Sequence, residues 1–121
     1  MDADRTILVA EDDEMIRAMI CEVMVEYGFQ PVEAASTAEA LGVVETRADL
    51  RAAFIDIDLG DRGGGYEVAR RMRKRRPGVR IVYTSGGARG DFERERVEGA
   101  LFVPKPYTPD RLCHLLAERL G

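Results

Sequence analysis

The sequence of 121 residues contains only two cysteines and one histidine, and it has no apolar run long enough to cross a membrane. Cys21 and Cys113 lie far apart, each inside a helical pattern, and they fit neither a metal-binding spacing nor a disulfide framework. Free thiols of this kind are typical of a reducing, intracellular location. The N-terminal apolar run is too short for a signal peptide. We therefore expect a cytoplasmic protein without membrane contact.

Positive charge is also in short supply, since 18 lysines and arginines face 22 acidic residues and the formal net charge is −4. A nucleic-acid-binding domain is more often basic, so this balance argues against nucleic acid as a partner. The dense basic run RRMRKRR, residues 70–76, is interpreted as a solvated helix face. The single histidine, His114, lies in the last predicted helix and is interpreted as a packing or partner-facing residue.

Strand-like and helix-like patterns alternate along the whole chain. Short apolar runs, several of them typical of strands covered on both faces, predict five strands. Their predicted ranges are Thr6–Ala10, 31–34, Ala52–Asp56, 79–83 and 101–103. This alternation favours an α/β fold, a parallel sheet with helices on both faces in three layers, and a single domain over residues 1–121.

Helix-start signals occur between the predicted strands. Asp13 is a candidate N-cap, Ser36 and Glu39 form a capping box, and Thr108 precedes a proline in a first turn. The first helix has an apolar face of residues 16, 20, 23 and 27, with Met15 and Met19 beside it. Residues 63–65 are predicted as a loop, and residues 85–99 as a flexible loop followed by a short, mobile fourth helix.

Charged and hydroxyl side chains follow the strands of this predicted sheet, where ligands bind in open parallel folds. Glu11 and Asp12 follow the first strand, Asp56 ends the third, Thr84 follows the fourth and Lys105 follows the fifth. Crowded carboxylates repel one another, and Mg²⁺ would offset their charge. A metal ion, an ammonium group and a hydroxyl together suit a transferring phosphoryl group, with Asp56 as the nucleophile.

Four segments in order resemble the receiver domain of two-component response regulators. They are ILVAEDDEMIR, FIDIDLGDRGGGYEVARRMR, IVYTSGG and LFVPKPYTPDRL, which together span nearly the whole chain. The resemblance implies a flavodoxin-like, CheY-like doubly wound sheet of five parallel strands in the order 2-1-3-4-5, with five helices.

The resemblance also implies a role for each matching residue. Asp56 would be the phosphoacceptor, and Glu11 and Asp12 the acidic pair that holds Mg²⁺, with Asp12 as the more direct ligand. Asp56 would also ligate the metal, as would Asp58 through its backbone carbonyl, while the Asp58 side chain adds a carboxylate near the site. Lys105 would pair with Asp56 and later with the phosphoryl group.

Two further features follow from the same resemblance. Thr84 would stabilise the phosphoryl group and, together with Phe102, form a conformational switch in which the aromatic ring rotates inward. The peptide bond between Lys105 and Pro106 would be cis.

The function that these features imply is a stand-alone phosphoacceptor of a two-component or phosphorelay system with no effector domain. It would take a phosphoryl group from a sensor histidine kinase or a histidine phosphotransfer protein. It would signal to a downstream protein target, or form a homodimer, through its fourth helix, fifth strand and fifth helix. Its own chemistry would be limited to self-phosphorylation and self-dephosphorylation, so it would not be an enzyme.

Two alternatives stay open at this point. Asp56 and Asp58 after an apolar strand also resemble the opening motif of haloacid-dehalogenase-type phosphatases, as nucleophile and general acid. That family usually has this motif near the N-terminus, whereas here the acidic pair lies upstream and no room remains for a substrate cap. The other alternative is a receiver-like binding module that is never phosphorylated.

Overall fold

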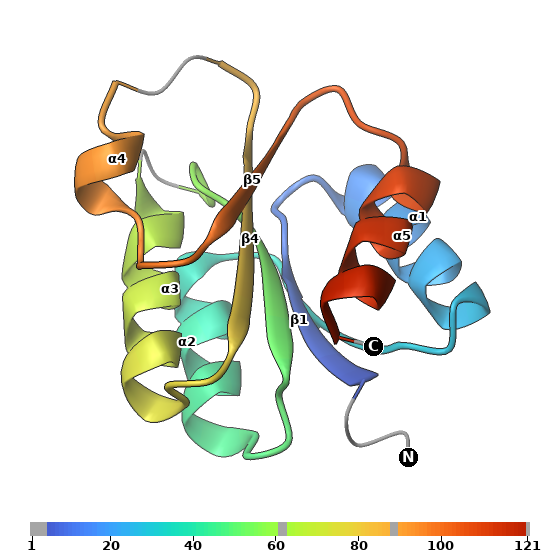
Figure 1. Cartoon of the computed structure of the whole chain (residues 1–121), viewed down its shortest axis with the longest axis horizontal. Coiled ribbons are helices and arrows are strands. Elements are labelled where there is room, and N and C mark those ends of the chain that lie inside the picture. Colours follow the sequence, from blue (N-terminus) through green and yellow to red (C-terminus); the bar gives the residue numbers. More distant parts are fainter. Residues whose placement is uncertain (1–4, 61–62, 88–89, 121) are drawn as a thin grey trace.

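The computed structural model describes residues 5–60, 63–87 and 90–120, and it shows a central sheet with helices on both faces (Figure 1). The five strands are parallel and lie in the order β2-β1-β3-β4-β5, which confirms the predicted topology. Their bounds are β1 Thr6–Ala10, β2 Gln30–Ala34, β3 Ala52–Asp56, β4 Arg80–Ser85 and β5 Leu101–Pro104. The helices are α1 Glu14–Glu26, α2 Thr37–Thr46, α3 Gly64–Arg75, α4 Phe92–Glu95 and α5 Pro109–Leu120.

Two apolar layers hold the helices to the sheet. Strands β1 and β3 are buried along their whole length because both of their faces are covered. Alternate residues of these strands enter the two layers, so that Ile7 and Phe54 pack with α1 and α5, whereas Leu8 and Ile55 pack with α2 and α3. The central strands therefore form a rigid base whose carboxyl ends carry the polar residues.

Helix α1 packs through its predicted apolar face, since Ile20 is buried and residues 16, 23 and 27 pack against the same cluster. Cys21 and Met24 are buried as well. Met15 and Met19, expected beside the apolar face, are 76% and 55% exposed. Each of these two methionines lies one position before a residue of that face, and a step of one residue turns a side chain by about 100° around a helix. They therefore point to solvent near the carboxyl edge of the sheet.

The predicted helix caps are present. Asp13 Oδ1 accepts from the backbone N–H of Ile16 at 3.0 Å, and Ser36 Oγ accepts from that of Glu39 at 3.1 Å. Glu39 Oε1 in turn accepts from the N–H of Ala35 at 2.8 Å, so the capping box closes one residue before the cap. Thr108 Oγ1 accepts from the N–H of Arg111 at 3.2 Å.

One helix and one strand bear on the predicted element lengths. Helix α4 has only four residues, as the glycine-rich segment before it indicated. The flexible loop expected before it includes residues 88–89, which lie outside the described residues. Strand β4 extends to Ser85, two residues beyond the predicted end, because Ser85 still pairs with Pro104 of β5.

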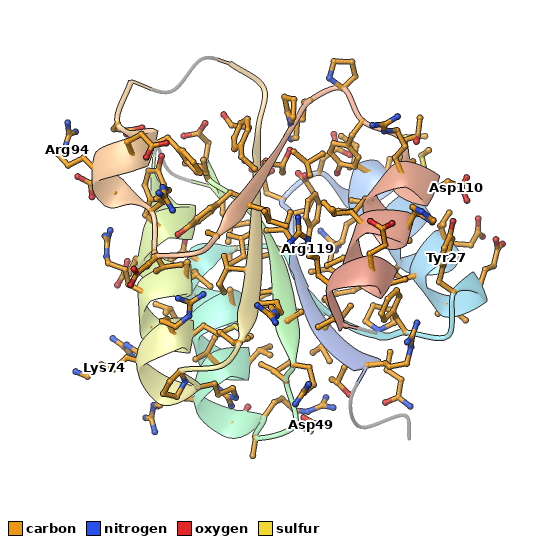
Figure 2. The ribbon with its side chains drawn as sticks, in the orientation of Figure 1. Tyr27, Asp49, Lys74, Arg94, Asp110 and Arg119 are labelled. Carbon is orange, nitrogen blue, oxygen red and sulfur yellow. The ribbon has the colours of Figure 1, made fainter. Side chains whose placement is uncertain are left out.

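The two cysteines and the histidine lie near the interface of α1 and α5. Both thiols are free and buried, and burial raises the pKa of Cys21 to about 11 and that of Cys113 to about 12. His114 is exposed, with Nε2 3.5 Å from Oε2 of Glu118, so it is not a packing residue. Tyr27 at the end of α1 reaches α5, where its hydroxyl donates to the carbonyl of Asp110 at 3.3 Å (Figure 2).

Among the described residues, every helix is too short or too polar to cross a bilayer.

The first turn of α3 packs directly on the end of β3. The structure corrects the predicted loop over residues 63–65, because Gly64 and Gly65 already belong to the helix. The N–H of Gly65 donates to the carbonyl of Ile57 at 2.7 Å. A Cβ at position 65 would lie 2.3 Å from the carbonyl oxygen of Asp56 and 2.8 Å from Cα of Ile57. Only glycine lets α3 approach the strand that carries Asp56 so closely.

We expect Gly65→Ala to lower the free energy of unfolding by about 1–3 kcal/mol, because the added methyl group must displace backbone atoms. Gly42→Ala is the matched control, since Gly42 lies within α2 and a Cβ there meets nothing within 4 Å. This control is expected to raise stability by up to about 1 kcal/mol through helix propensity. Urea unfolding of both variants measures the difference, and equal effects would contradict the close approach at Gly65.

Candidate functional site

The carboxyl ends of four strands bring the predicted site residues to one edge of the sheet. Glu11 and Asp12 directly follow β1, Asp56 ends β3, and Thr84 lies beside Asp56 in the register of β3 and β4. Lys105 follows β5, and its backbone N–H donates to the carbonyl of Ser85 at 3.1 Å. The fold thus collects side chains that are up to 94 positions apart (105 − 11) in the sequence.

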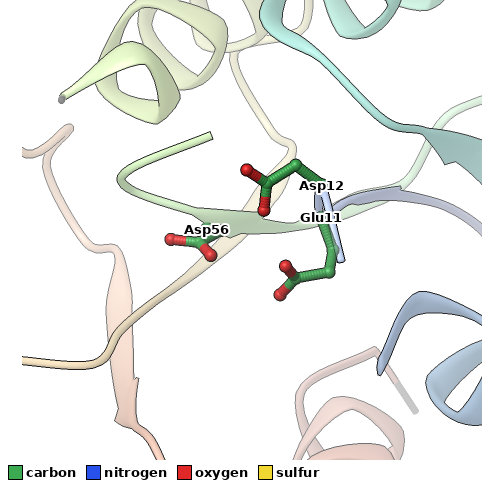
Figure 3. A group of neighbouring side chains, drawn as sticks. All are labelled: Glu11, Asp12 and Asp56. Atoms are coloured by element: carbon green, nitrogen blue, oxygen red, sulfur yellow. The ribbon is translucent and has the colours of Figure 1, made fainter. Parts of the chain in front are cut away.

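Three of these side chains form a compact acidic cluster. Glu11, Asp12 and Asp56 each place one carboxylate oxygen within 4.8 Å of the others (Figure 3). Glu11 and Asp56 are 1% and 6% exposed, whereas Asp12 faces solvent. Hard oxygen ligands at an accessible edge are the set that Mg²⁺ takes in proteins, so these three residues could hold a divalent cation.

Lys105 provides the positive charge that the structure itself places in this cluster. Its Nζ lies 2.9 Å from Oδ2 of Asp56 and 3.3 Å from Oε1 of Glu11. Burial acts to lower the pKa of Lys105, but the hydrogen bond and charge of Asp56 and the charge of Glu11 outweigh it and raise the pKa. The ammonium group is therefore retained at neutral pH. The peptide bond between Lys105 and Pro106 is cis.

Glu11 is almost fully buried, which disfavours the charged form of its carboxyl group. Burial and the negative charge of Asp56 raise its pKa, although the N–H of Asp13, which donates to Oε2 at 3.0 Å, and the charge of Lys105 oppose that shift. One ammonium group does not balance three carboxylates, so the ionised cluster has excess negative charge. A bound cation would relieve this excess.

The carboxylate of Asp56 is held at both oxygens. Lys105 binds Oδ2, and the backbone N–H of Asp58 donates to Oδ1 at 2.9 Å. The Asp58 side chain lies outside the cluster of three carboxylates, because its Oδ1 accepts from the N–H of Gly63 at 3.2 Å. Asp58 thus orients the carboxylate of Asp56 through its backbone N–H, and its side chain binds Gly63 at the start of α3.

Thr84 places a buried hydroxyl next to Asp56. The residue is 0% exposed. Within the described part of the chain, its Oγ1 has no hydrogen-bond partner. An unsatisfied buried hydroxyl is costly, so it marks a position where a further polar group would be stabilised.

Phe102 lies on β5, beside Tyr83 of β4 in the register of the two strands. Its ring is partly buried and contacts Phe92 of α4 edge-on, with centroids 5.1 Å apart. Phe92 in turn contacts Tyr83, the residue before Thr84, at 5.6 Å. Aromatic contacts therefore connect Phe102 with the strand that carries the buried hydroxyl.

Sequence reasoning missed two residues that support the acidic pair. The Nη1 of Arg17 donates to the carbonyl of Glu11 at 2.8 Å, while its Nε pairs with Glu33 of β2 at 2.9 Å. The N–H of Gly60 donates to Oδ2 of Asp12 at 3.3 Å. The position of Arg17 one helical turn after the N-cap Asp13 was the available signal, because it places the guanidinium beside the end of β1.

Comparisons with known proteins agree on one family. The family model of the response regulator receiver domain matches residues 7–117. The photosynthetic apparatus regulatory protein RegA of Cereibacter sphaeroides is 35% identical over 116 residues, which cover 94% of this chain and 62% of RegA. The sensor kinase CckA of Brucella abortus is 29% identical over 121 residues, covering 95% of this chain and 12% of the kinase.

A solved structure shows the same architecture. The response regulator receiver protein from Sinorhizobium medicae WSM419 superposes with a TM-score of 0.87 at 27% identity, covering 95% of this chain and 93% of that one. The chain spans 45% and 62% of the length of the RegA proteins of Rhodobacter capsulatus and Cereibacter sphaeroides.

We expect Glu11→Gln to make the protein more stable than wild type at pH 7 in metal-free buffer. A carboxyl whose pKa is raised on folding contributes stability below its unfolded pKa and loses it as the pH rises through the folded pKa. Because glutamine never ionises, the advantage of the variant should shrink as the pH falls from 7 to 4. Urea unfolding across this range measures it. Glu22→Gln, at an exposed position of α1, is the control and should show no such trend.

Proposed function

Because this chain belongs to the response regulator receiver domain family, a signalling module of two-component systems, we propose that Asp56 accepts a phosphoryl group from a phosphohistidine. The observation that carries this proposal is the convergence of Glu11, Asp12 and Lys105 around the Asp56 carboxylate. A carboxylate oxygen of Asp56 attacks the phosphorus, the P–N bond to the donor imidazole breaks, and an acyl phosphate forms.

Each polar residue then has a part in this transfer. Lys105 starts on Asp56 and moves to an oxygen of the phosphoryl group, which carries the negative charge after transfer. The backbone N–H of Asp58 holds the attacking carboxylate in place. Thr84 donates its hydroxyl, which has no partner among the described residues, to a second phosphoryl oxygen.

We assign a Mg²⁺ site to Glu11, Asp12 and Asp56, with the backbone carbonyl of Asp58 as a further ligand. The fit rests on the three carboxylate oxygens within 4.8 Å of one another and on their excess negative charge. When bound, the cation would lower the repulsion between these carboxylates and the incoming phosphoryl oxygens.

The conformational readout in this proposal involves Thr84 and Phe102. As Thr84 moves toward the phosphoryl group, it leaves space behind it, and the half-buried ring of Phe102 turns inward to fill that space. The ring must then leave its edge contact with Phe92. The surface formed by α4, β5 and α5 changes, which alters its affinity for a downstream protein target or for a second copy of the chain.

Two surfaces support protein partners of this kind. An apolar pocket of about 370 Å³ beside Lys105 is lined in part by Met19, Ile20 and Tyr107, where the donor protein would dock. The relatives include a sensor kinase, which supports a histidine kinase or a histidine phosphotransfer protein as that donor. A groove of about 560 Å³ lies between β5 and α5, lined in part by Phe102.

The alternative of a haloacid-dehalogenase-like phosphatase is less well supported. It needs the carboxyl group of Asp58 as a general acid at the reacting phosphate, but that side chain accepts from Gly63. The alternative of a module that is never phosphorylated leaves the complete acidic cluster and its lysine without a role. We propose that the chain has no turnover activity beyond its own phosphorylation and dephosphorylation.

Asp56→Asn is expected to abolish covalent phosphorylation by acetyl phosphate with Mg²⁺, because the amide is not a nucleophile for this transfer. Intact-protein mass spectrometry should show one added phosphoryl group in wild type and none in the variant. Asp58→Asn is the matched control and should retain the modification, since its backbone carbonyl and N–H stay in place. Steady hydrolysis of phosphate esters, lost in Asp58→Asn, would instead support the phosphatase alternative.

Thr84→Val is expected to leave the unmodified protein as stable as wild type or more stable, because it removes a buried hydroxyl that has no described partner. The same change should slow phosphorylation by acetyl phosphate about tenfold or more through loss of one donor to the phosphoryl group. Thr84→Ser should show the opposite pattern, with a loss of about 1 kcal/mol of stability from the missing methyl group and a near-normal rate. Phosphorylation of Thr84→Val at the wild-type rate would contradict the role of the hydroxyl.

A further inference from the structure

The basic run of α3 is a solvated helix face, as predicted, since Arg70, Arg71 and Arg75 are exposed, yet most of its arginines also bind neighbouring elements. On the α2 side, Arg71 and Arg75 pair with Glu45, and Arg76 donates to backbone carbonyls at the end of α2. On the α4 side, Arg70 binds Glu95, the last residue of α4, and Arg73 binds Glu98 just after it. The proposed function uses none of these contacts.

Helix α4 has few interactions of its own to keep it in place. It has four residues, no side-chain hydrogen bond at its N-cap, and no buried residue. The last carbonyls of a helix have no partner within it, and this helix is a single turn. Partners from other elements must therefore hold it.

One stripe of α3 provides those partners. The Tyr66 hydroxyl donates to Oδ1 of Asp91 at 3.0 Å. Arg70 Nη1 donates to the carbonyl of Glu95 at 3.1 Å and lies 3.2 Å from its Oε1.

Arg73 completes the stripe: its Nη1 donates to the carbonyl of Glu98, just after α4, at 2.6 Å, and its Nη2 donates to that of Val79, before β4, at 3.1 Å. Each donor is 25 positions before its acceptor in the segment 91–98, so α3 and that segment lie side by side and run in the same direction. Residues 66, 70 and 73 are spaced as neighbours on one helix face, and cationic side chains at the carbonyl end of a helix are favourable.

The position of α4 in turn determines where Phe92 lies. This ring contacts both Tyr83 and Phe102, and the hydroxyl of Tyr83 accepts from the N–H of Val97 at 3.2 Å. A shift of α4 away from α3 would therefore move Phe92 and break its edge contact with Phe102.

We propose that Arg70 and Arg73 are positioning residues that hold α4 against α3 and so favour the resting arrangement of Phe92 and Phe102. This inference rests on the proposed function, because it concerns how much of the protein occupies the resting packing before phosphorylation. Interactions present in only one of two packings shift the population toward that packing. We call these contacts of Arg70 and Arg73 with the α4 segment the clamp. The Arg70 side chain is 53% exposed and that of Glu95 is 34% exposed, so their ion pair is weak. The clamp therefore shifts the equilibrium between the two packings modestly and leaves it reversible.

The experiment compares two double variants of α3 that remove the same charge. Arg70→Gln with Arg73→Gln removes the bonds to Glu95 and Glu98, together with the bond from Arg73 to Val79. Arg71→Gln with Arg75→Gln, the matched control, removes only the pairs with Glu45. In the first variant, we expect amide hydrogen exchange of Arg96 and Val97 to become about fivefold faster than in wild type, from the loss of two charge-assisted bonds. Phosphorylation by acetyl phosphate should also become faster, by up to about fivefold, because more molecules occupy the reactive packing.

The control variant should match wild type in both measurements. Tyr66→Phe, a milder change in the same stripe, should shift both in the same direction by a smaller factor, which covers the case in which the double variant does not fold. Unchanged exchange in the α4-side variants would overturn the clamp. Faster exchange with unchanged or slower phosphorylation would overturn its effect on the switch, because purely structural damage does not speed phosphorylation.

Failure of the proposed function would appear separately, as absence of phosphorylation in wild type itself. In that case the NMR signals of the Phe102 ring decide whether the arginines position it. A shift in the α4-side variants but not in the control supports the clamp, and no shift overturns it.

Discussion

The Lys105 ammonium group, shared between two nearly buried carboxylates, is the interaction on which the rest of the site depends. Its Nζ is 2.9 Å from Asp56 and 3.3 Å from Glu11, and without it both acids would be buried unpaired at the edge of an apolar core. One ammonium group is nevertheless too little positive charge for a cluster that also contains Asp12. This imbalance makes the site suited to a cation. In the proposed function, Lys105 would also follow the charge that develops on a phosphoryl group.

The molecule combines a rigid site with a weakly held periphery. Strands β1 and β3 are buried throughout, and α3 packs through Gly65 directly on the backbone that carries Asp56. Helix α4, by contrast, contributes no buried residue and is held by side chains of α3 and by ring contacts. The proposed phosphoryl transfer needs side chains in fixed positions, which β1 and β3 provide. The proposed conformational switch needs an element whose two positions differ little in energy, and α4 fits that requirement.

Helix α3 connects these two parts. Its first turn contacts β3, its arginines contact both α2 and the α4 segment, and Lys74, which carries none of these contacts, points outward (Figure 2). The basic run is therefore a solvated helix face, as predicted, whose arginines also bind the neighbouring elements.

Local patterns in the sequence by themselves determined the strand positions, the caps at Asp13, Ser36 and Thr108, and the residues at the strand ends, because apolar runs and cap signals act over a few residues. The sequence could not determine the partners of Arg17 and Arg70, the exposure of Met15 and Met19, or the direction of the Asp58 side chain. These features depend on which segments meet across tens of residues. Only the packed sheet and helices bring those segments within hydrogen-bond distance, so the tertiary structure alone decided them.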